Sequence, residues 1–270
     1  MEAGLRAILF AALAAGAAAQ SVEFQTLNQS VIEQRLGAYT TNNATREAEV
    51  RKLFQEAKCK DESLSEQVVK GTKWPNLICT LKGTTDSMIV VGAHFDFIDK
   101  GKGVVDNWSG ASLLPSFYES LSANPRKHTI VFVAFTGEEQ DLMGSRAFVK
   151  ELGPRKGDVK AMINLDTVGL GPTEVWLSHA DPQLAKWLFG VAANLKIPAS
   201  AMNVDGVGTT DSEPFREKKI PAMTVHSLTQ ATLRVLHSPA DKIEAIRMDD
   251  YYQTYRLLAA YLAVIDQKLD

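Results

Sequence analysis

The chain has 270 residues, which suits one large α/β domain or two small ones. Hydrophobic residues make up 45% of it and charged residues 23%, as in an ordinary soluble globular protein. The formal net charge of −3 gives no reason to expect a nucleic acid or an anionic membrane as a partner.

The first nineteen residues have the pattern of a secretory signal. Arg6 precedes an apolar run over residues 7–19, and Ala17 and Ala19 satisfy the small-residue rule for cleavage before Gln20. The alternative is a membrane anchor, but the run is shorter than the roughly 20 apolar residues that span a bilayer. We therefore expect a signal peptide over residues 1–19, one domain over residues 20–270, and a secreted or periplasmic location.

Two cysteines are present, Cys59 and Cys79. An exported protein can join two cysteines in a disulfide, whereas the alternative is a pair of buried thiols. We favour the disulfide, because Cys79 falls within an expected strand and Cys59 just before another. Neither cysteine has a His or Cys partner at the spacing of a metal site.

The expected elements begin with a helix around Val50 and Leu53, which follow a helical apolar period and which Asn43 can cap. A hairpin follows, with strands over residues 64–70 and 76–82 and Gly71 between them. Further strands are expected over residues 88–93, 129–135, 161–165, 174–177 and 220–225, and helices over residues 109–123, 144–152, 182–195 and 249–265.

Buried strands that alternate with helices predict an α/β fold in which both faces of the sheet are covered. Ligands of such sheets bind beyond the carboxyl ends of the strands. Seven acidic or histidine residues follow expected strands or stand in loops with glycine or proline nearby. They are His94, Asp96, Asp106, Glu138, Glu139, Asp166 and His237.

Each of these residues has an ordinary explanation when it is taken alone. His94 with Asp96 can be a surface pair, and Asp106 can cap a helix. Adjacent glutamates such as Glu138 and Glu139 are usually solvated. An Asp at a strand end, such as Asp166, is often a turn signal. As a set, however, they supply the ligands for two divalent metals and one spare carboxylate, which is what metal-assisted hydrolysis requires.

The order and spacing of these motifs resemble the zinc-dependent peptidases of family M28, the aminopeptidase group with two co-catalytic zincs. The similarity extends from roughly Leu64 to the C-terminus. The matching motifs are His94-Phe95-Asp96, Asp106-Asn107-Trp108-Ser109-Gly110, Gly137-Glu138-Glu139, Asp166 and His237-Ser238-Pro239-Ala240-Asp241.

The resemblance implies a three-layer α/β/α sandwich around a mixed, mostly parallel sheet, two Zn²⁺ ions, and a role for each matching residue. The implied zinc ligands are His94 and Asp166 for one ion, Glu139 and His237 for the other, and Asp106 as the bridge. Glu138 is implied to be the general base and acid, and Asp96 to orient His94. Relatives often carry Tyr where Leu236 stands, and Pro115 inside an expected helix predicts a kink.

The expected function is therefore an exported metallopeptidase, most simply an aminopeptidase that acts on a peptide substrate. One alternative is an acyltransferase similar to glutaminyl cyclase, with a similar fold and one zinc, against which the full ligand set argues. Another is a non-catalytic binding domain of the same fold. A binding domain needs metal ligands but has no use for a spare carboxylate such as Glu138.

Overall fold

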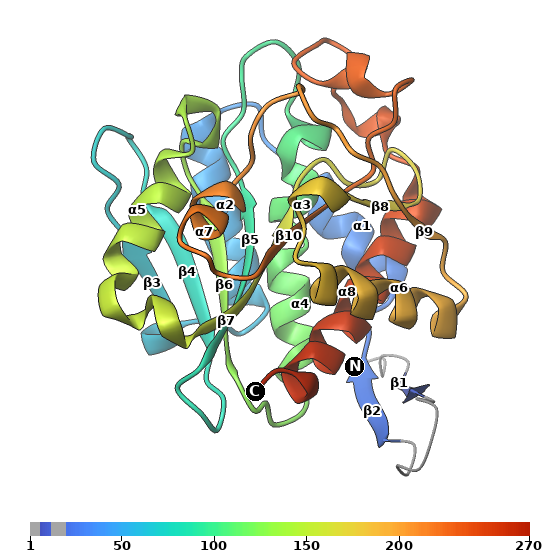
Figure 1. The fold of residues 1–270 in the computed structure, drawn as a ribbon. Coiled ribbons are helices and arrows are strands. Elements are labelled where there is room, and N and C mark those ends of the chain that lie inside the picture. The colour runs from blue at the N-terminus through green and yellow to red at the C-terminus, as the bar shows by residue number, and fades with distance from the viewer. Residues whose placement is uncertain (1–5, 12–19) are drawn as a thin grey trace.

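Helices cover both faces of one large β-sheet, so that the molecule has three layers (Figure 1). The computed structural model describes residues 6–11 and 20–270, with side chains described from residue 22 onward. The sheet has eight strands in the order β3-β4-β6-β5-β7-β10-β8-β9. In that order the bounds are Leu64–Gln67, Asn76–Leu81, Thr129–Phe135, Met88–His94, Val159–Leu165, Ala222–His226, Thr173–Val175 and Ala199–Ala201.

The four central strands, β6, β5, β7 and β10, run parallel to one another. On either side the sheet becomes antiparallel, where β4 pairs with β6 and β8 pairs with β10. β3 pairs with β4 as the expected antiparallel hairpin, and β9 is parallel to β8. The mixed, mostly parallel sheet that the sequence predicted is confirmed. Parallel neighbours need crossover connections, and these connections place helices on the faces of the sheet.

Alternate side chains of the central strands enter two separate hydrophobic cores. On β5, Ile89 and Val91 pack on one face, and Met88 and Val90 pack on the other. All four are buried, which explains why the strand has a continuous apolar sequence rather than an alternating one.

Five longer helices pack on the larger core and two helices pack on the smaller core. Figure 1 shows helices on both sides of the sheet. The five helices are α1 Gln29–Gly37, α2 Asn43–Glu56, α4 Leu114–Leu121, α6 Pro182–Leu195 and α8 Met248–Lys268. The two on the other face are α5 Met143–Leu152 and α7 Glu213–Glu217. The three-layer prediction is therefore confirmed.

The cap of α2 differs from the prediction by one residue. The side chain of Asn42, not of Asn43, accepts the hydrogen bond from the backbone N–H of Ala44. Asn43 instead makes two hydrogen bonds to the backbone of Phe97, in the loop after β5. Asn43 thus ties α2 to a segment that leads into the candidate site.

The helix expected over residues 109–123 is divided at the proline that predicted a kink. A short helix, α3 Ser109–Ala111, ends before a turn, and α4 begins one residue before Pro115. At this position the missing N–H of proline would have had no partner within the helix. Beyond the break, α4 packs on β6 and β5.

A disulfide joins Cys59 and Cys79, which are 20 residues apart. Cys79 lies on β4 and Cys59 in the turn after α2, so the bond attaches the helical layer to the antiparallel side of the sheet. Both cysteines are fully buried.

We expect thiol titration of the denatured, non-reduced protein to find no free thiol. Replacing both residues by serine should lower the free energy of unfolding in urea by about 3 kcal/mol, because the closed loop restricts the unfolded chain. Two reactive thiols in the untreated protein would contradict the bond.

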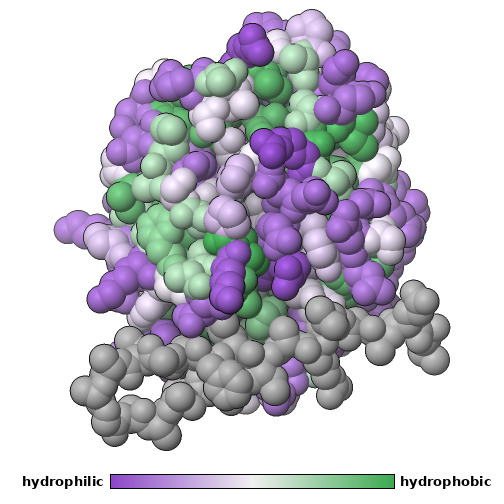
Figure 2. Space-filling view, turned by 90° about the vertical axis from the view of Figure 1, so that its right-hand side faces the viewer, coloured by the Kyte–Doolittle hydropathy of each residue, from purple (hydrophilic) through white to green (hydrophobic). Residues whose placement is uncertain are grey.

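Part of the expected signal segment, residues 1–19, lies outside the described residues. Within it, β1 Arg6–Ala11 pairs antiparallel with β2 Gln20–Gln25. Among the described helices, none is long and apolar enough to cross a membrane. On the face that carries α6, hydrophilic side chains are interspersed with hydrophobic ones (Figure 2). The large hydrophobic side chains exposed on the described part of the chain are Val68, Leu177 and Val207.

Candidate active site

The candidate site lies at the carboxyl ends of the parallel strands, where the chain changes direction across the sheet. β5 lies between β6 and β7 in the sheet and pairs with both. A crevice forms at such a switch point, because the connections leave the strand in opposite directions. His94 is the last residue of β5, and Asp166 follows β7 directly. Glu138 and Glu139 begin a turn that is separated from β6 by Thr136 and Gly137.

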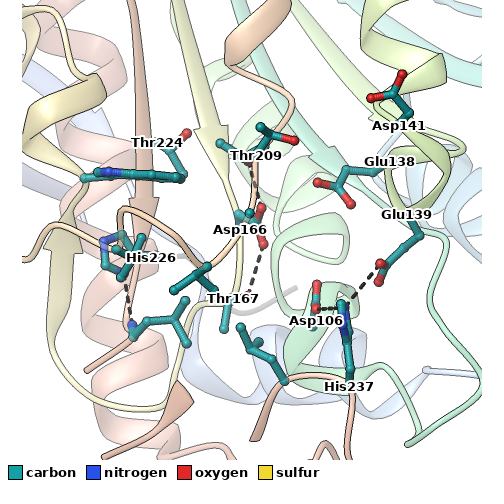
Figure 3. Close-up of a pocket in the computed structure, with 17 residues that line it drawn as sticks. Asp106, Glu138, Glu139, Asp141, Asp166, Thr167, Thr209, Thr224, His226 and His237 are labelled. Atoms are coloured by element: carbon teal, nitrogen blue, oxygen red, sulfur yellow. Dashed lines mark hydrogen bonds and ion pairs between the residues drawn. The ribbon is translucent and has the colours of Figure 1, made fainter. Parts of the chain in front are cut away.

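Two ligands come from loops rather than strand ends. Asp106 lies in the segment before α3, and His237 lies in the long connection between β10 and α8. The structure brings both to the same crevice as the strand-end residues (Figure 3). All five predicted metal ligands therefore meet at one place, together with Glu138.

The potential ligand atoms form two groups of three, which are His94, Glu138 and Asp166, and then Asp106, Glu139 and His237. Asp106 stands between the groups. Its Oδ1 lies 3.3 Å from Nε2 of His94, and its Oδ2 lies 3.2 Å from Nε2 of His237. One carboxylate oxygen faces each histidine, which is the geometry that a bridging ligand requires. Nε2 of His237 also lies 3.2 Å from Oε2 of Glu139.

The hydrogen bond of His94 decides which of its nitrogens faces the carboxylates. Nδ1 lies 3.0 Å from the backbone carbonyl of Asp96, so Nδ1 carries the proton and donates it. In the neutral form that binds a metal, Nε2 carries no proton, and it faces Oδ1 of Asp106 and, at 3.8 Å, Oδ1 of Asp166. Acceptors gathered in this way repel one another unless a cation lies between them.

The charges of the site produce large pKa shifts. Burial lowers the pKa of His94, but the carboxylates of Glu138, Asp106 and Asp166 outweigh burial and hold that pKa well above its usual value. Burial and the nearby Asp106 raise the pKa of Glu139 to about 7. The hydrogen bond to Asp106 is the main cause that raises the pKa of His237, to about 9. This concentration of negative charge suits divalent cations.

Zinc fits these residues. It binds histidine nitrogen and carboxylate oxygen, and catalytic zinc sites use three protein ligands with a further position open. With Asp106 shared, each predicted ligand set supplies three. One oxygen of Glu139, Oε1, is buried without a hydrogen-bond partner among the described residues, as expected of an atom that faces a cation.

Asp96 is close to His94, but its backbone carbonyl, and not its carboxylate, accepts the hydrogen bond from the His94 ring. Its carboxylate Oδ1 lies 3.8 Å from Nδ1 of His94, beyond hydrogen-bond distance, and the backbone carbonyl holds the ring instead. The carboxylate accepts from the backbone N–H groups of Glu138 and Glu139, at 3.2 and 3.3 Å. These N–H groups begin a 3-10 turn and have no partner within it. Asp96 therefore positions both glutamates.

Three further residues position the ligands and were missed by sequence reasoning. Asp241 accepts from the backbone N–H groups of Val105 and Asp106, at 2.7 and 3.4 Å. Thr167 and Thr210 donate to the two oxygens of Asp166, at 3.0 and 2.8 Å. Asp241 stands in the motif of His237, but the threonines carry no sequence signal, because they act through hydroxyls supplied by separate loops.

A pocket of about 280 Å³ opens beside the metal ligands. In Figure 3 the ligands Asp106, Glu139 and His237 lie on one side of it, and His226 and Thr224 on the other. The apolar residues of the lining are Trp176, Val204, Val207, Leu228 and Leu236. No Lys or Arg is among the described residues that line the pocket.

His226 lines this pocket but has no free nitrogen for chemistry. Its Nε2 donates to the carbonyl of Met202 at 3.0 Å, and its Nδ1 accepts from the N–H of Leu228 at 3.0 Å. Burial lowers its pKa to about 4, so the ring is neutral at pH 7. These contacts give His226 a structural role in the wall of the pocket.

Comparison with known proteins places this site in a family. The model of "Peptidase family M28" matches residues 76–262, which contain all seven predicted site residues. The aminopeptidase YwaD of Bacillus subtilis is 29% identical over 191 residues, which are 67% of this chain and 42% of that protein. Leupeptin-inactivating enzyme 1 of Streptomyces exfoliatus is 27% identical over 152 residues, 55% of this chain and 33% of that protein. The chain thus spans less than half the length of these two relatives.

Solved structures agree on the fold. The Legionella pneumophila LapA aminopeptidase superposes with a TM-score of 0.79 at 21% identity, over 90% of this chain and 72% of that one. BSAP, a zinc aminopeptidase from Bacillus subtilis, superposes with a TM-score of 0.65 at 25% identity, over 73% of this chain and 50% of that one. A glutaminyl cyclase from an Acidobacteriales bacterium superposes with a TM-score of 0.70 at 18% identity, over 89% of this chain and 94% of that one. With its family model, its sheet and its grouped metal ligands in agreement, the chain belongs to peptidase family M28.

Proposed function

We propose that this chain is an exported aminopeptidase that binds two zinc ions and hydrolyses N-terminal peptide bonds. The observation that carries the proposal is the arrangement of four ligands around Asp106, with Glu138 beside them and an adjoining pocket that all of these residues except His94 line. The N-terminal pattern of residues 1–19 supports export. The names of relatives such as YwaD and BSAP support aminopeptidase activity and zinc.

His94, Asp166, Glu139 and His237 would hold the metals, with Asp106 between them. Zinc supplies a Lewis acid there, which polarises a carbonyl and lowers the pKa of water. Glu138 takes the proton from the attacking water and returns it to the leaving amine. Asp96 holds the backbone of Glu138 through the hydrogen bond to its N–H, so the base keeps its place while the proton moves.

The charge of the pocket favours the amino end of a peptide over the carboxyl end. A C-terminal carboxylate is usually recognised by Arg or Lys, and the described lining contains neither. It does contain the carboxylate of Asp141, which is assigned to no metal and suits an α-ammonium group. A pocket of about 280 Å³ lies near the lower limit of roughly 300 Å³ for ligand pockets, so it suits a terminal residue.

The activity test compares leucine p-nitroanilide with its N-acetylated form, because only the former offers a free amine. We expect turnover of the free substrate, none of the blocked one, and loss of turnover with a zinc chelator. Turnover restricted to blocked or C-terminal substrates would contradict an aminopeptidase. No turnover with zinc bound would favour a non-catalytic binding domain.

Zinc content is the second test. We expect close to two zinc ions per chain in the active protein, because two three-ligand sets share Asp106. The measurement is elemental analysis of protein dialysed against metal-free buffer, with activity assayed on the same sample. One zinc in fully active protein would overturn the paired site.

A glutaminyl cyclase-like acyltransferase is the alternative that one observation favours. The matched cyclase is covered over 94% of its own chain, whereas LapA is covered over 72%, so this chain has the size of the cyclase. The distinguishing experiment offers a peptide with N-terminal glutamine and follows its mass. Loss of ammonia with the peptide bond intact supports cyclisation, and release of free glutamine supports the aminopeptidase.

A further inference from the structure

One wall of the pocket is a single segment, Met202–Thr210, which we call the wall segment. It runs from the end of β9 to the side of Asp166. Val204 and Val207 from this segment line the pocket, together with Trp176 from the end of β8. Val207 is one of the exposed large hydrophobic residues, although it faces a pocket whose other apolar members are mostly buried.

Both ends of the wall segment are fixed to the sheet. At one end, the N–H of Met202 donates to the carbonyl of Val175, and its own carbonyl accepts from His226. At the other end, the hydroxyl of Thr210 accepts from Asn164 and donates to Asp166. The part between these ends must be held by other contacts if the pocket is to keep its shape.

Asp205 supplies most of the contacts that hold the middle of the wall segment. Its Oδ1 accepts from the indole Nε1 of Trp176 at 3.1 Å and from the hydroxyl of Ser178 at 2.9 Å. The same oxygen lies 3.4 Å from Nε2 of His179. The ring of His179 stacks on that of Trp176, with centroids 4.2 Å apart. Asp205 thus fastens the segment to the largest apolar side chain of the pocket.

The residues just beyond Asp205 are weakly held. Gly206 and Gly208 have φ values of +87° and +153°, and a Cβ at either position would meet nothing within 4 Å. In this stretch the N–H of Val207 donates to Val204, within the segment itself. Val207 therefore follows a stretch that is held by Asp205 and by Asn203, whose Oδ1 accepts from the N–H of Ser178 at 2.9 Å.

We propose that Asp205 is a positioning residue that sets the preference for an apolar N-terminal side chain. By fixing the wall segment to Trp176, it keeps Val204 and Val207 in the lining of the pocket, where they form its apolar part together with Trp176, Leu228 and Leu236. This proposal rests on the proposed aminopeptidase function. Asp205 touches neither the metal ligands nor Glu138 among its described contacts, so the chemistry itself does not depend on it.

The test measures kcat and KM of Asp205→Ala for leucine and alanine p-nitroanilides. One methylene in an apolar pocket changes specificity by roughly 10-fold or more, so loosening one wall should raise KM for the leucine substrate about 10-fold. KM for the alanine substrate and kcat for both should stay unchanged, because only binding of the side chain is lost. An equal change for both substrates, or none, would overturn the proposal.

Two further variants separate the hydrogen bond from other effects. Asp205→Asn keeps an acceptor of the same shape without the charge, so it should restore most of the leucine preference. Trp176→Phe keeps an aromatic ring but removes the donor, so adding Asp205→Ala to it should have little further effect. Full additivity of the two changes would show that Asp205 does not act through Trp176. Asp86→Ala, at an exposed carboxylate that pairs with Lys82, controls for loss of a surface charge.

Calorimetric measurement of the binding of free leucine and free alanine tests the proposal without an activity assay. If the wild type binds leucine better than alanine and Asp205→Ala loses that difference, the proposal stands even where no peptide is hydrolysed. If peptides are hydrolysed but the variant keeps the wild-type difference, the proposed function stands and the role of Asp205 is wrong. Melting temperature should not change, since the side chain of Asp205 is 57% exposed.

Discussion

Replacing Glu138 by glutamine is expected to lower kcat by about 10²–10⁴-fold while zinc content stays at the wild-type value. The amide keeps the shape of the side chain and removes its basicity, so KM should change little. Burial raises the pKa of Glu138 well above its usual value, and Asp166, Asp211 and Asp106 raise it further despite the opposing effect of His94. A carboxylate in such surroundings accepts a proton readily, which suits a general base.

Glu139→Gln is the matched variant for this test, because the two glutamates are adjacent and carry the same group. Oε2 of Glu139 lies 3.2 Å from Nε2 of His237, so its loss should loosen the zinc that the two residues share. Zinc content and kcat are measured side by side for both variants.

The geometry also allows the reverse assignment, since Glu138 groups with His94 and Asp166 within ligand distance. Loss of zinc from Glu138→Gln, with both ions kept by Glu139→Gln, would reverse the two roles. Full activity of Glu138→Gln would require another base.

Replacing Asp96 by asparagine is expected to weaken zinc binding and kcat together, by roughly 10–100-fold, without unfolding the protein. The carboxylate accepts from the N–H groups of both glutamates, and asparagine offers an acceptor to one of them and an NH₂ group to the other. The turn would shift, and with it both the ligand Glu139 and the base Glu138.

The measurements for this variant are zinc affinity by competition with a chelator, kcat, and the melting temperature. Asp99→Asn is the control, because Asp99 is an exposed carboxylate three residues away in the same loop. Wild-type zinc affinity and kcat in Asp96→Asn would show that the hydrogen bonds to the turn do not matter for function.

The fold followed from the sequence because its central strands are buried on both faces. Such strands are continuous apolar runs, and β6 and α6 have the bounds that the apolar pattern predicts. Boundaries set by polar side chains were less certain. By sequence alone, Asn42 and Asn43 are equally good caps for α2. In the structure the side chain of Asn43 binds the backbone of Phe97, and Asn42 caps the helix.

The sequence by itself determined the chemistry of the site, because the predicted ligands are histidine and carboxylate side chains in recognisable motifs, three of them at or just beyond strand ends and two, Asp106 and His237, in loops. Tertiary structure alone decided how those ligands are held. The carboxylate of Asp96 binds the turn after β6 and leaves the imidazole of His94 to the backbone carbonyl of Asp96, because backbone N–H groups of a distant segment lie closer to the carboxylate. Asp205 reaches Trp176 across 29 residues of chain. Such contacts depend on loops that meet only after the sheet has formed, and no local pattern of residues records them.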